Sequence, residues 1–208
     1  MTASTETPGT PETPSGDPRL WRWLALGVVL LAFVVAFLTV YSRLPKPLAD
    51  IPMTNHHGKT VRLSDYRGKW LIVYFGYTGC PDACPTGLGE IAKALQDMGP
   101  DRDVIQPIFI SLDHKNDTPE RLSKYLPYFD PAFIGHRVEE PALSLVAKQF
   151  GVTYVTAESS TYGTIIDHSL HAYLVDPGGV RRDSFATTFP PDFLRKRLMQ
   201  HGWKGAST

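Results

Sequence analysis

The longest apolar run of the chain lies near its amino terminus. Residues 24–41 contain one clearly polar side chain, Thr39, in eighteen positions. As an α-helix this run would be about 27 Å long at roughly 1.5 Å per residue, close to the thickness of the hydrocarbon core of a bilayer. Trp21 lies just before the run and Tyr41 ends it, as aromatic side chains do at membrane interfaces. The pattern predicts a transmembrane anchor over residues 21–43.

A cleaved signal peptide is the alternative explanation of this run. The run is longer than the roughly 7–15 apolar residues of a signal peptide, and no clear small-x-small cleavage site follows it. Residues 1–20, which are rich in Pro and Thr, predict a disordered tail. Their acidic residues argue against a mitochondrial targeting peptide. We therefore expect a retained single-pass anchor in a bacterial inner membrane, with an orientation that the equal flanking charges do not set.

Residues 44–208 are enough for one ordinary domain. The continuous apolar run 70–75 is typical of a strand buried on both faces. Helical spacing of apolar residues follows over 85–96, and a second apolar run, 104–112, predicts another buried strand. Pro107 inside it requires an edge, a bulge or a late start of pairing. The order strand, helix, strand implies a parallel pair with a right-handed crossover.

Further patterns complete an α/β fold. Asp117 and Glu120 have the spacing of an N-terminal capping box. We expect a central mixed sheet with helices on both faces. The remaining expected elements are a hairpin over 54–63, a helix over 141–150 with Gly151 as its C-cap, a polar loop over 159–163, a hairpin of 173–175 and 180–185, and a helix over 190–201.

The only two cysteines, Cys80 and Cys84, lie on the connector between the first strand and its helix. A proline follows each of them, which disfavours helical geometry at both, and Pro85 is a natural first helical residue. Sulfur at a helix N-terminus is biased toward thiolate. Ligands gather at the carboxyl ends of parallel strands, where the cysteines and Asp113 both lie. We expect Asp113 to organise the loop beside the cysteines.

His168 is the strongest histidine candidate. It lies just before a predicted strand and beside Asp167, a carboxylate suited to fixing the tautomer of the ring. His171 is three residues further along and faces the opposite side of an extended chain. The other histidines are expected to be solvated rather than metal ligands: His56, His57, His114, His136 and His201.

The order of motifs resembles that of the Sco/SenC copper proteins, over roughly residues 50–200. The matching motifs are 74–78 with 80–85, Asp113 with 117–119, 129–131 with 133–135, and 167–169 before 173–177. There are two departures, and neither removes a ligand. Gly79 stands where an aromatic residue or His often precedes the first cysteine, and His114 stands where Pro often follows the aspartate.

The resemblance implies a thioredoxin-like fold on a membrane anchor, with the domain in the periplasm. It implies copper bound by Cys80, Cys84 and His168, and from the residue patterns above we expect Asp167 and Asp113 to support these ligands. It also implies a role in assembling the binuclear copper site of cytochrome c oxidase. The expected partners are the copper-bearing oxidase subunit, the bilayer through residues 24–41, and another protein as a candidate copper donor.

The chemistry of the residues agrees with copper. Two thiolates and an imidazole suit Cu(I), and Cu(II) heads the divalent affinity order. A structural zinc site usually has a fourth protein ligand, which the sequence does not offer. The charges balance, with 21 Lys and Arg against 21 Asp and Glu, and are scattered, so nucleic-acid binding is not indicated.

Two other roles of the cysteines stay open. The first is an extracytoplasmic thiol–disulfide oxidoreductase that reduces the cysteines of the oxidase site. Redox thioredoxins resemble one another in a two-residue gap between their cysteines and in a proline that faces them. Here the gap between Cys80 and Cys84 is three residues, and Asp167 and His168 stand in the place of that proline. Both differences favour metal binding over thiol–disulfide exchange. The second is an inert structural disulfide, which does not explain a position at the functional end of the sheet.

Overall fold

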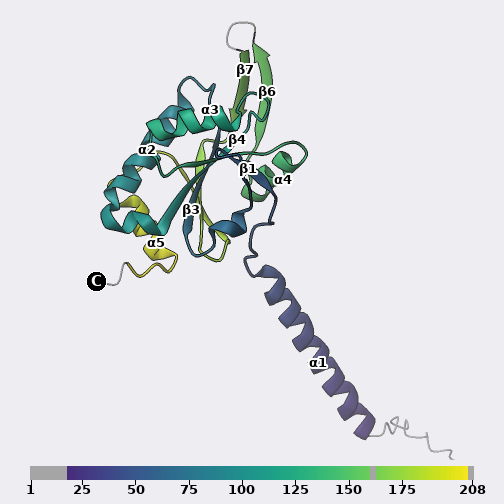
Figure 1. Ribbon diagram of the computed structural model, residues 1–208. Helices are drawn as coiled ribbons and strands as arrows, with labels where there is room; N and C mark the ends of the chain where they lie inside the picture. Colours follow the sequence, from purple (N-terminus) through teal and green to yellow (C-terminus); the bar gives the residue numbers. More distant parts are fainter. Residues whose placement is uncertain (1–17, 160–162, 206–208) are drawn as a thin grey trace, which may run out of the picture. The chain divides into compact units, whose positions relative to one another are not determined.

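The computed structural model describes residues 18–159 and 163–205 of the chain. The chain divides into an amino-terminal unit ending at Leu44 and a second unit beginning at Pro45. The amino-terminal unit holds one described helix, α1 (Pro18–Arg43), drawn in purple in Figure 1. The expected tail, residues 1–20, lies almost wholly outside the described residues, as do residues 160–162 of the expected loop.

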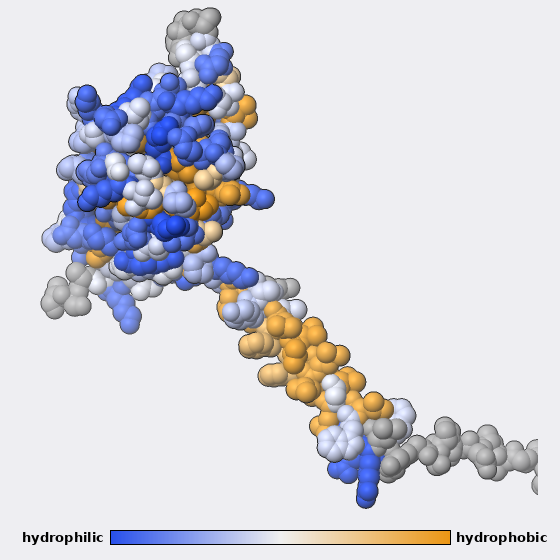
Figure 2. All heavy atoms as spheres, turned by 45° about the vertical axis from the view of Figure 1, so that its right-hand side comes forward, coloured by the Kyte–Doolittle hydropathy of each residue, from blue (hydrophilic) through white to orange (hydrophobic). Residues whose placement is uncertain are grey.

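Helix α1 contains a stretch, Trp21–Ser42, whose 22 residues are long and apolar enough to cross a membrane. Its apolar side chains are exposed, Phe33 to 73%, and Figure 2 shows them covering the visible face of the helix. By its length and composition this stretch is a candidate membrane span.

The second unit is built on a seven-stranded mixed sheet in the order β2-β1-β5-β4-β3-β8-β9. Figure 1 labels its strands β1, β3 and β4. The central strands β3, β4 and β5 are parallel to one another, and the outer pairings are antiparallel. The strands are β1 (Met53–Asn55), β2 (Thr60–Val61), β3 (Trp70–Gly76), β4 (Ile105–Ser111), β5 (Ile134–Arg137), β8 (His171–Val175) and β9 (Arg181–Ala186). The helical elements are η1 (Leu63–Tyr66), α2 (Ala83–Asp97), η2 (Gly99–Val104), α3 (Pro119–Tyr125), η3 (Leu126–Tyr128), α4 (Ala142–Phe150) and α5 (Phe193–Gln200).

Consecutive residues of β3 show that helices cover both faces of the sheet. Tyr74 lies against Gly87 of α2, where an added Cβ would be 2.7 Å from the tyrosine hydroxyl oxygen. Phe75 packs edge to face on Phe150 of α4, with ring centroids 5.2 Å apart. Neighbouring strand residues point to opposite faces, so α2 and α4 lie on opposite sides of β3. All seven residues of β3 are buried, as predicted for its continuous apolar run.

Most of the predicted elements are confirmed. Both predicted hairpins are present, as β1–β2 and β8–β9. Gly151 ends α4 in the left-handed region, at φ 72°. Pro107 is tolerated in β4 because the pairing with β5 begins only at Ile108. On the edge of β4 that faces β5, no backbone N–H is therefore needed at Pro107.

A second sheet was not predicted. Residues 154–158 and 164–168, for which the sequence predicted no element, and the ends of the predicted loop form β6 (Tyr154–Ser159) and β7 (Gly163–His168), an antiparallel pair with a sheet of its own. Figure 1 shows the pair projecting beyond the edge of the main body, near α3. Only Ile166 of its twelve strand residues is buried. The hairpin therefore buries little of its surface against the rest of the domain.

Candidate metal centre

The two cysteines lie where the carboxyl end of β3 turns into α2. The backbone N–H of Cys80 donates to the carbonyl of Tyr77 at 3.3 Å, which closes a turn, and α2 begins at Ala83. Cys84 is therefore helical, and the expectation that Pro85 would keep it out of the helix is wrong. The restriction before proline is a bias, which the packing of this buried residue overrides.

The two sulfurs have different environments. The backbone N–H of Cys84 donates to Cys80 Sγ at 3.3 Å, so this half-buried sulfur caps the start of the helix. Cys84 is fully buried, and burial raises the pKa of its thiol strongly. The predicted bias toward thiolate is therefore wrong for Cys84 in the metal-free protein, since desolvation outweighs the helix N-terminus. Both cysteines are free rather than joined in a disulfide.

His168 reaches the cysteines from the end of β7. Its Nε2 lies 3.5 Å from Cys84 Sγ, across 84 residues of sequence. Its Nδ1 lies 3.1 Å from the carbonyl oxygen of Ser169, and since a carbonyl only accepts, Nδ1 carries the hydrogen of the neutral ring. Burial lowers the pKa of His168, which keeps the ring neutral. Nε2 therefore presents a lone pair toward Cys84.

This arrangement fits a thiolate and an imidazole on one metal ion. With zinc bond lengths of about 2.3 Å to sulfur and about 2.0 Å to nitrogen as a guide, two ligands at a tetrahedral angle are roughly 3.5 Å apart. The observed distance between Cys84 Sγ and His168 Nε2 is 3.5 Å. Across residues 18–159 and 163–205, no three His, Cys, Asp or Glu side chains already surround a metal position. A site with three protein ligands here would therefore require the sulfur of Cys80 to move toward the other two.

Asp167 does not orient the ring in the predicted way. The partner of His168 Nδ1 is the carbonyl of Ser169, and Asp167 is exposed on the hairpin. Its charge still favours the protonated form of the imidazole, against the larger effect of burial. Tyr77 packs against the ring of His168 edge to face, with ring centroids 6.4 Å apart.

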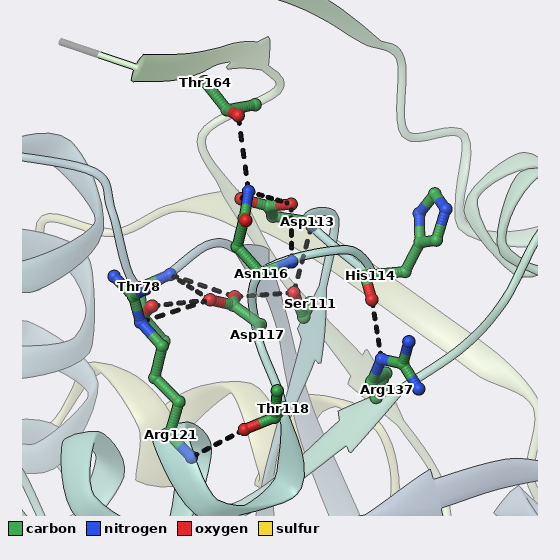
Figure 3. Close-up of polar contacts among 10 residues, drawn as sticks. All are labelled: Thr78, Ser111, Asp113, His114, Asn116, Asp117, Thr118, Arg121, Arg137 and Thr164. Carbon is green, nitrogen blue, oxygen red and sulfur yellow. Dashed lines mark hydrogen bonds and ion pairs between the residues drawn. The ribbon is translucent and has the colours of Figure 1, made fainter.

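Asp117 anchors the segment that leads into Cys80, a role that the sequence did not predict. Its side chain is fully buried and accepts hydrogen bonds from the N–H of Thr78 at 3.0 Å and from the hydroxyls of Thr78 and Ser111 at 2.5 and 2.6 Å (Figure 3). The predicted capping box is wrong. The N-cap of α3 is Thr118, whose hydroxyl accepts from the N–H of Arg121.

Asp113 organises its own loop, as expected. Its carboxylate accepts from the backbone N–H of Asn116 at 3.2 Å and from the side-chain amide of Asn116 at 2.9 and 3.1 Å. The same amide reaches Thr164 of β7 at 3.3 Å (Figure 3). The loop that follows β4 thus contacts the segment before Cys80 on one side and the hairpin that carries His168 on the other.

Two further histidine predictions need correction. His136 is fully buried in β5, with Nε2 2.9 Å from the hydroxyl of Tyr66, and burial lowers its pKa to about 4. His56 is half-buried, and its Nδ1 accepts from the N–H of Gly135 at 3.0 Å. Its Nε2 therefore carries the hydrogen and donates to His57 Nε2 at 2.9 Å, which pairs these two rings without a metal.

The chain is similar in sequence and in fold to several known proteins. The SCO1/SenC family model matches residues 49–201. A SCO2-like protein of Rickettsia felis is 32% identical over 142 residues, which are 67% of this chain and 69% of that protein. The human mitochondrial SCO1 homolog is 34% identical over 150 residues, 67% of this chain and 48% of its own length. The structure of Bradyrhizobium japonicum ScoI with copper bound covers 74% of this chain and 99% of that one, with 32% identity and a TM-score of 0.68.

Proposed function

This chain belongs to the SCO1/SenC family, and we propose that it is a membrane-anchored metallochaperone that carries copper to the binuclear copper site of cytochrome c oxidase. The proposed copper ligands are Cys80, Cys84 and His168. The observation that carries the proposal is the 3.5 Å between the sulfur of Cys84 and His168 Nε2, whose lone pair is directed at that sulfur. The copper-bound structure of a relative that is 32% identical supports the choice of metal.

The protonation states set what binding requires. His168 is neutral and ready to donate its Nε2 lone pair, because its pKa is lowered by burial. Cys84 holds its proton in the metal-free protein, so copper binding must displace that proton. The buried thiol is thus kept protonated until a metal ion replaces the proton.

Release follows from the unequal exposure of the sulfurs. Cys84 is fully buried, whereas Cys80 is partly exposed and is the ligand that a thiolate of a partner reaches first. In the proposed transfer, ligands of the receiving oxidase subunit replace Cys80 on the copper, and then Cys84 and His168, without a change in copper oxidation state. Another copper donor protein would load the site by the reverse exchange.

The anchor places this exchange at a membrane. We propose that α1 spans a bacterial inner membrane and that the second unit lies in the periplasm. The stretch Trp21–Ser42 supports the span by length and composition. An oxidising periplasm makes a reductant for the two free cysteines a further requirement.

The deciding experiment compares histidines. The reduced second unit, residues 45–208, is titrated with Cu(I) and with Cu(II), as wild type and as His168→Ala. The matched control is His171→Ala, because His171 is exposed at the start of β8, three residues from His168. We expect His168→Ala to weaken Cu(II) binding at least tenfold and His171→Ala to leave it unchanged. Equal Cu(II) affinities in all three proteins would remove His168 from the site.

A thiol–disulfide reductase is the second candidate, and the contrast between an accessible Cys80 and a buried Cys84 favours it. Cys80 thiolate would attack a disulfide of the partner and form a mixed disulfide, and Cys84 would then attack Cys80. Two electrons and two protons would pass to the partner, leaving a Cys80–Cys84 disulfide. A rate of general disulfide reduction as fast as that of a thioredoxin would favour this role over copper delivery.

A further inference from the structure

The hairpin β6–β7 needs support from the body of the domain to hold His168 in place. It is a two-stranded sheet, and such a hairpin alone is at best marginally stable in water. Near its base the N–H of Ser169 donates to the carbonyl of Thr153 at 3.2 Å, and Ile166 is buried. Also at the base, the hydroxyl of Tyr154, the residue of β6 that pairs with His168, lies 2.5 Å from Glu140 Oε1 and 3.2 Å from Ser144 Oγ. Contacts further along β7 add to this support by limiting how the hairpin turns about its base.

We propose that Asn116 is a positioning residue for His168, acting through Thr164 of β7. Asn116 Nδ2 donates to Thr164 Oγ1 at 3.3 Å, and Thr164 Oγ1 in turn donates to the carboxylate of Glu158 on β6 at 3.3 Å. The hydroxyl of Thr164 thus accepts one hydrogen bond, from Asn116, and donates one, to Glu158. This inference rests on the proposed copper site, whose histidine ligand it concerns.

The amide of Asn116 is itself held in the orientation that the contact needs. Asp113, which is 7% exposed, accepts from Asn116 Nδ2 at 2.9 Å and from the backbone N–H of Asn116 at 3.2 Å (Figure 3). An amide nitrogen has two hydrogens, so one serves Asp113 and the other serves Thr164. These contacts with Asp113 restrict the rotamers of Asn116 independently of Thr164, which reduces the entropy lost in forming the contact with the hairpin.

The loop that carries Asn116 also holds the cysteine segment. Asp117, the next residue, is fully buried and binds the N–H and hydroxyl of Thr78, two residues before Cys80. One short loop thus links the sulfur ligands to the histidine ligand. Thr164 lies four residues before His168, roughly 13 Å along an extended strand, so a contact there limits rotation of the hairpin about its base.

The consequence is a population effect on copper affinity. If the hairpin leaves its docked orientation for part of the time, the apparent dissociation constant rises in inverse proportion to the docked fraction. Loss of one hydrogen bond of this kind changes such an equilibrium by about two- to tenfold. The affinity for Cu(II), which needs the imidazole, should fall when the docked fraction falls. The affinity for Cu(I), which two thiolates can hold, should fall less.

The test uses residues 45–208, a compact unit by its contacts, with Asn116→Ala and Thr164→Val as the disrupting variants. Thr164→Ser keeps the hydroxyl that Asn116 contacts, so its hairpin exchange and copper affinity should match those of the wild type. Glu158→Ala is the control, since it removes the other partner of Thr164 and leaves Asn116 intact. In the metal-free protein we measure amide hydrogen exchange and the proton contacts between the rings of Tyr77 and His168. We expect exchange in β6–β7 to rise two- to tenfold in the disrupting variants, with weakened ring contacts and unchanged exchange in β3.

Copper titrations complete the test and separate the two proposals. We expect Asn116→Ala to weaken Cu(II) binding two- to tenfold and Cu(I) binding less than twofold. Unchanged hairpin exchange and ring contacts in Asn116→Ala would overturn the positioning role, whatever copper does. Faster exchange with unchanged Cu(II) affinity would overturn it as well, provided that His168→Ala weakens Cu(II). If His168→Ala itself has no effect, the proposed copper site fails, while exchange and ring contacts still decide whether Asn116 holds the hairpin.

Discussion

Gly76, the last residue of β3, leaves the space that the sulfur of Cys84 fills. A Cβ on Gly76 would lie 2.9 Å from Cys84 Sγ and 3.1 Å from Cε2 of Phe109. Cys84 and Phe109 are both fully buried, so neither has solvent to move into. The absence of a side chain at Gly76 is therefore part of what fixes the position of the proposed ligand.

We predict that Gly76→Ala weakens copper binding by displacing Cys84. A close-packed core tolerates an added methyl poorly, and overpacking costs about 1–3 kcal/mol of unfolding free energy. Affinities for Cu(I) and Cu(II) should both fall, because the sulfur serves both ions. Competition titrations and urea denaturation measure the two effects.

Gly89→Ala is the matched control for this prediction. Gly89 lies in α2, and a Cβ there meets nothing within 4 Å. Replacing a helical glycine by alanine stabilises by roughly 0.5–1 kcal/mol where there is room. Equal copper affinities in Gly76→Ala and Gly89→Ala would show that the space beside Cys84 does not matter.

We predict that Asp117→Ala damages both the fold and the site. The change leaves the N–H of Thr78 and the hydroxyls of Thr78 and Ser111 without their buried acceptor. Each unsatisfied donor costs about 1–3 kcal/mol, so the unfolding free energy should fall by about 3 kcal/mol or more. The segment before Cys80 should loosen, and Cu(I) affinity should fall together with Cu(II) affinity.

Glu120→Ala is the comparison that separates Asp117 from the rest of its helix. Glu120 is exposed in the first turn of α3, and its loss should change the urea midpoint little. A variant of Asp117 that unfolds at the wild-type urea concentration would contradict the anchoring role of its carboxylate.

The sequence predicted the main sheet well because its strong signals are local. The apolar run of β3, the helical spacing of α2 and the glycine after α4 each depend on a few adjacent residues. The mixed sheet with helices on both faces follows from the order of these elements, and it is confirmed. The family resemblance, confirmed by the match over residues 49–201, added the thioredoxin-like fold.

The errors arose where contacts over long sequence separations decide the outcome. Asp117 has the spacing of a cap, yet its buried carboxylate serves Thr78, 39 residues earlier. His136 was expected to be solvated, yet it is buried in β5, which pairs with β1 on one side and β4 on the other. The hairpin β6–β7 escaped prediction because its mostly exposed strands show no alternation of apolar and polar residues.

We predict that copper affinity rises with pH. Burial raises the pKa of the Cys84 thiol, so this group is protonated at neutral pH and must lose its proton when copper binds. Each displaced proton makes affinity rise about tenfold per pH unit, so the loss of the Cys84 proton sets a slope of at least this size. Cu(I) competition titrations at pH 6, 7 and 8 measure the slope, and His168→Ala should keep it, because His168 is already neutral. A flat profile would mean that Cys84 is not a ligand.

We predict that the full chain fractionates with membranes and that residues 45–208 alone do not. The exposed apolar stretch Trp21–Ser42 is the reason. An arginine at Phe33, in the middle of the stretch, should cost about 2.5–3.5 kcal/mol of insertion free energy and release part of the protein, while Thr39→Ser should not. A carboxyl-terminal reporter that is active only outside the cytoplasm measures the proposed orientation. An inactive reporter on a membrane-bound chain would place the domain in the cytoplasm.

We predict that His136 makes the fold sensitive to mild acid. Burial lowers the pKa of His136 to about 4, below the usual 6.5. Between these values the unfolded chain binds a proton that the folded chain does not, so stability is complete above pH 6.5 and is lost as pH falls toward 4. The loss is on the order of 3 kcal/mol. Urea midpoints from pH 7 to pH 4.5 should fall less steeply in His136→Gln than in wild type or in His201→Gln, a control at a half-buried histidine near the end of the chain. Three parallel profiles would show that His136 does not carry the acid sensitivity.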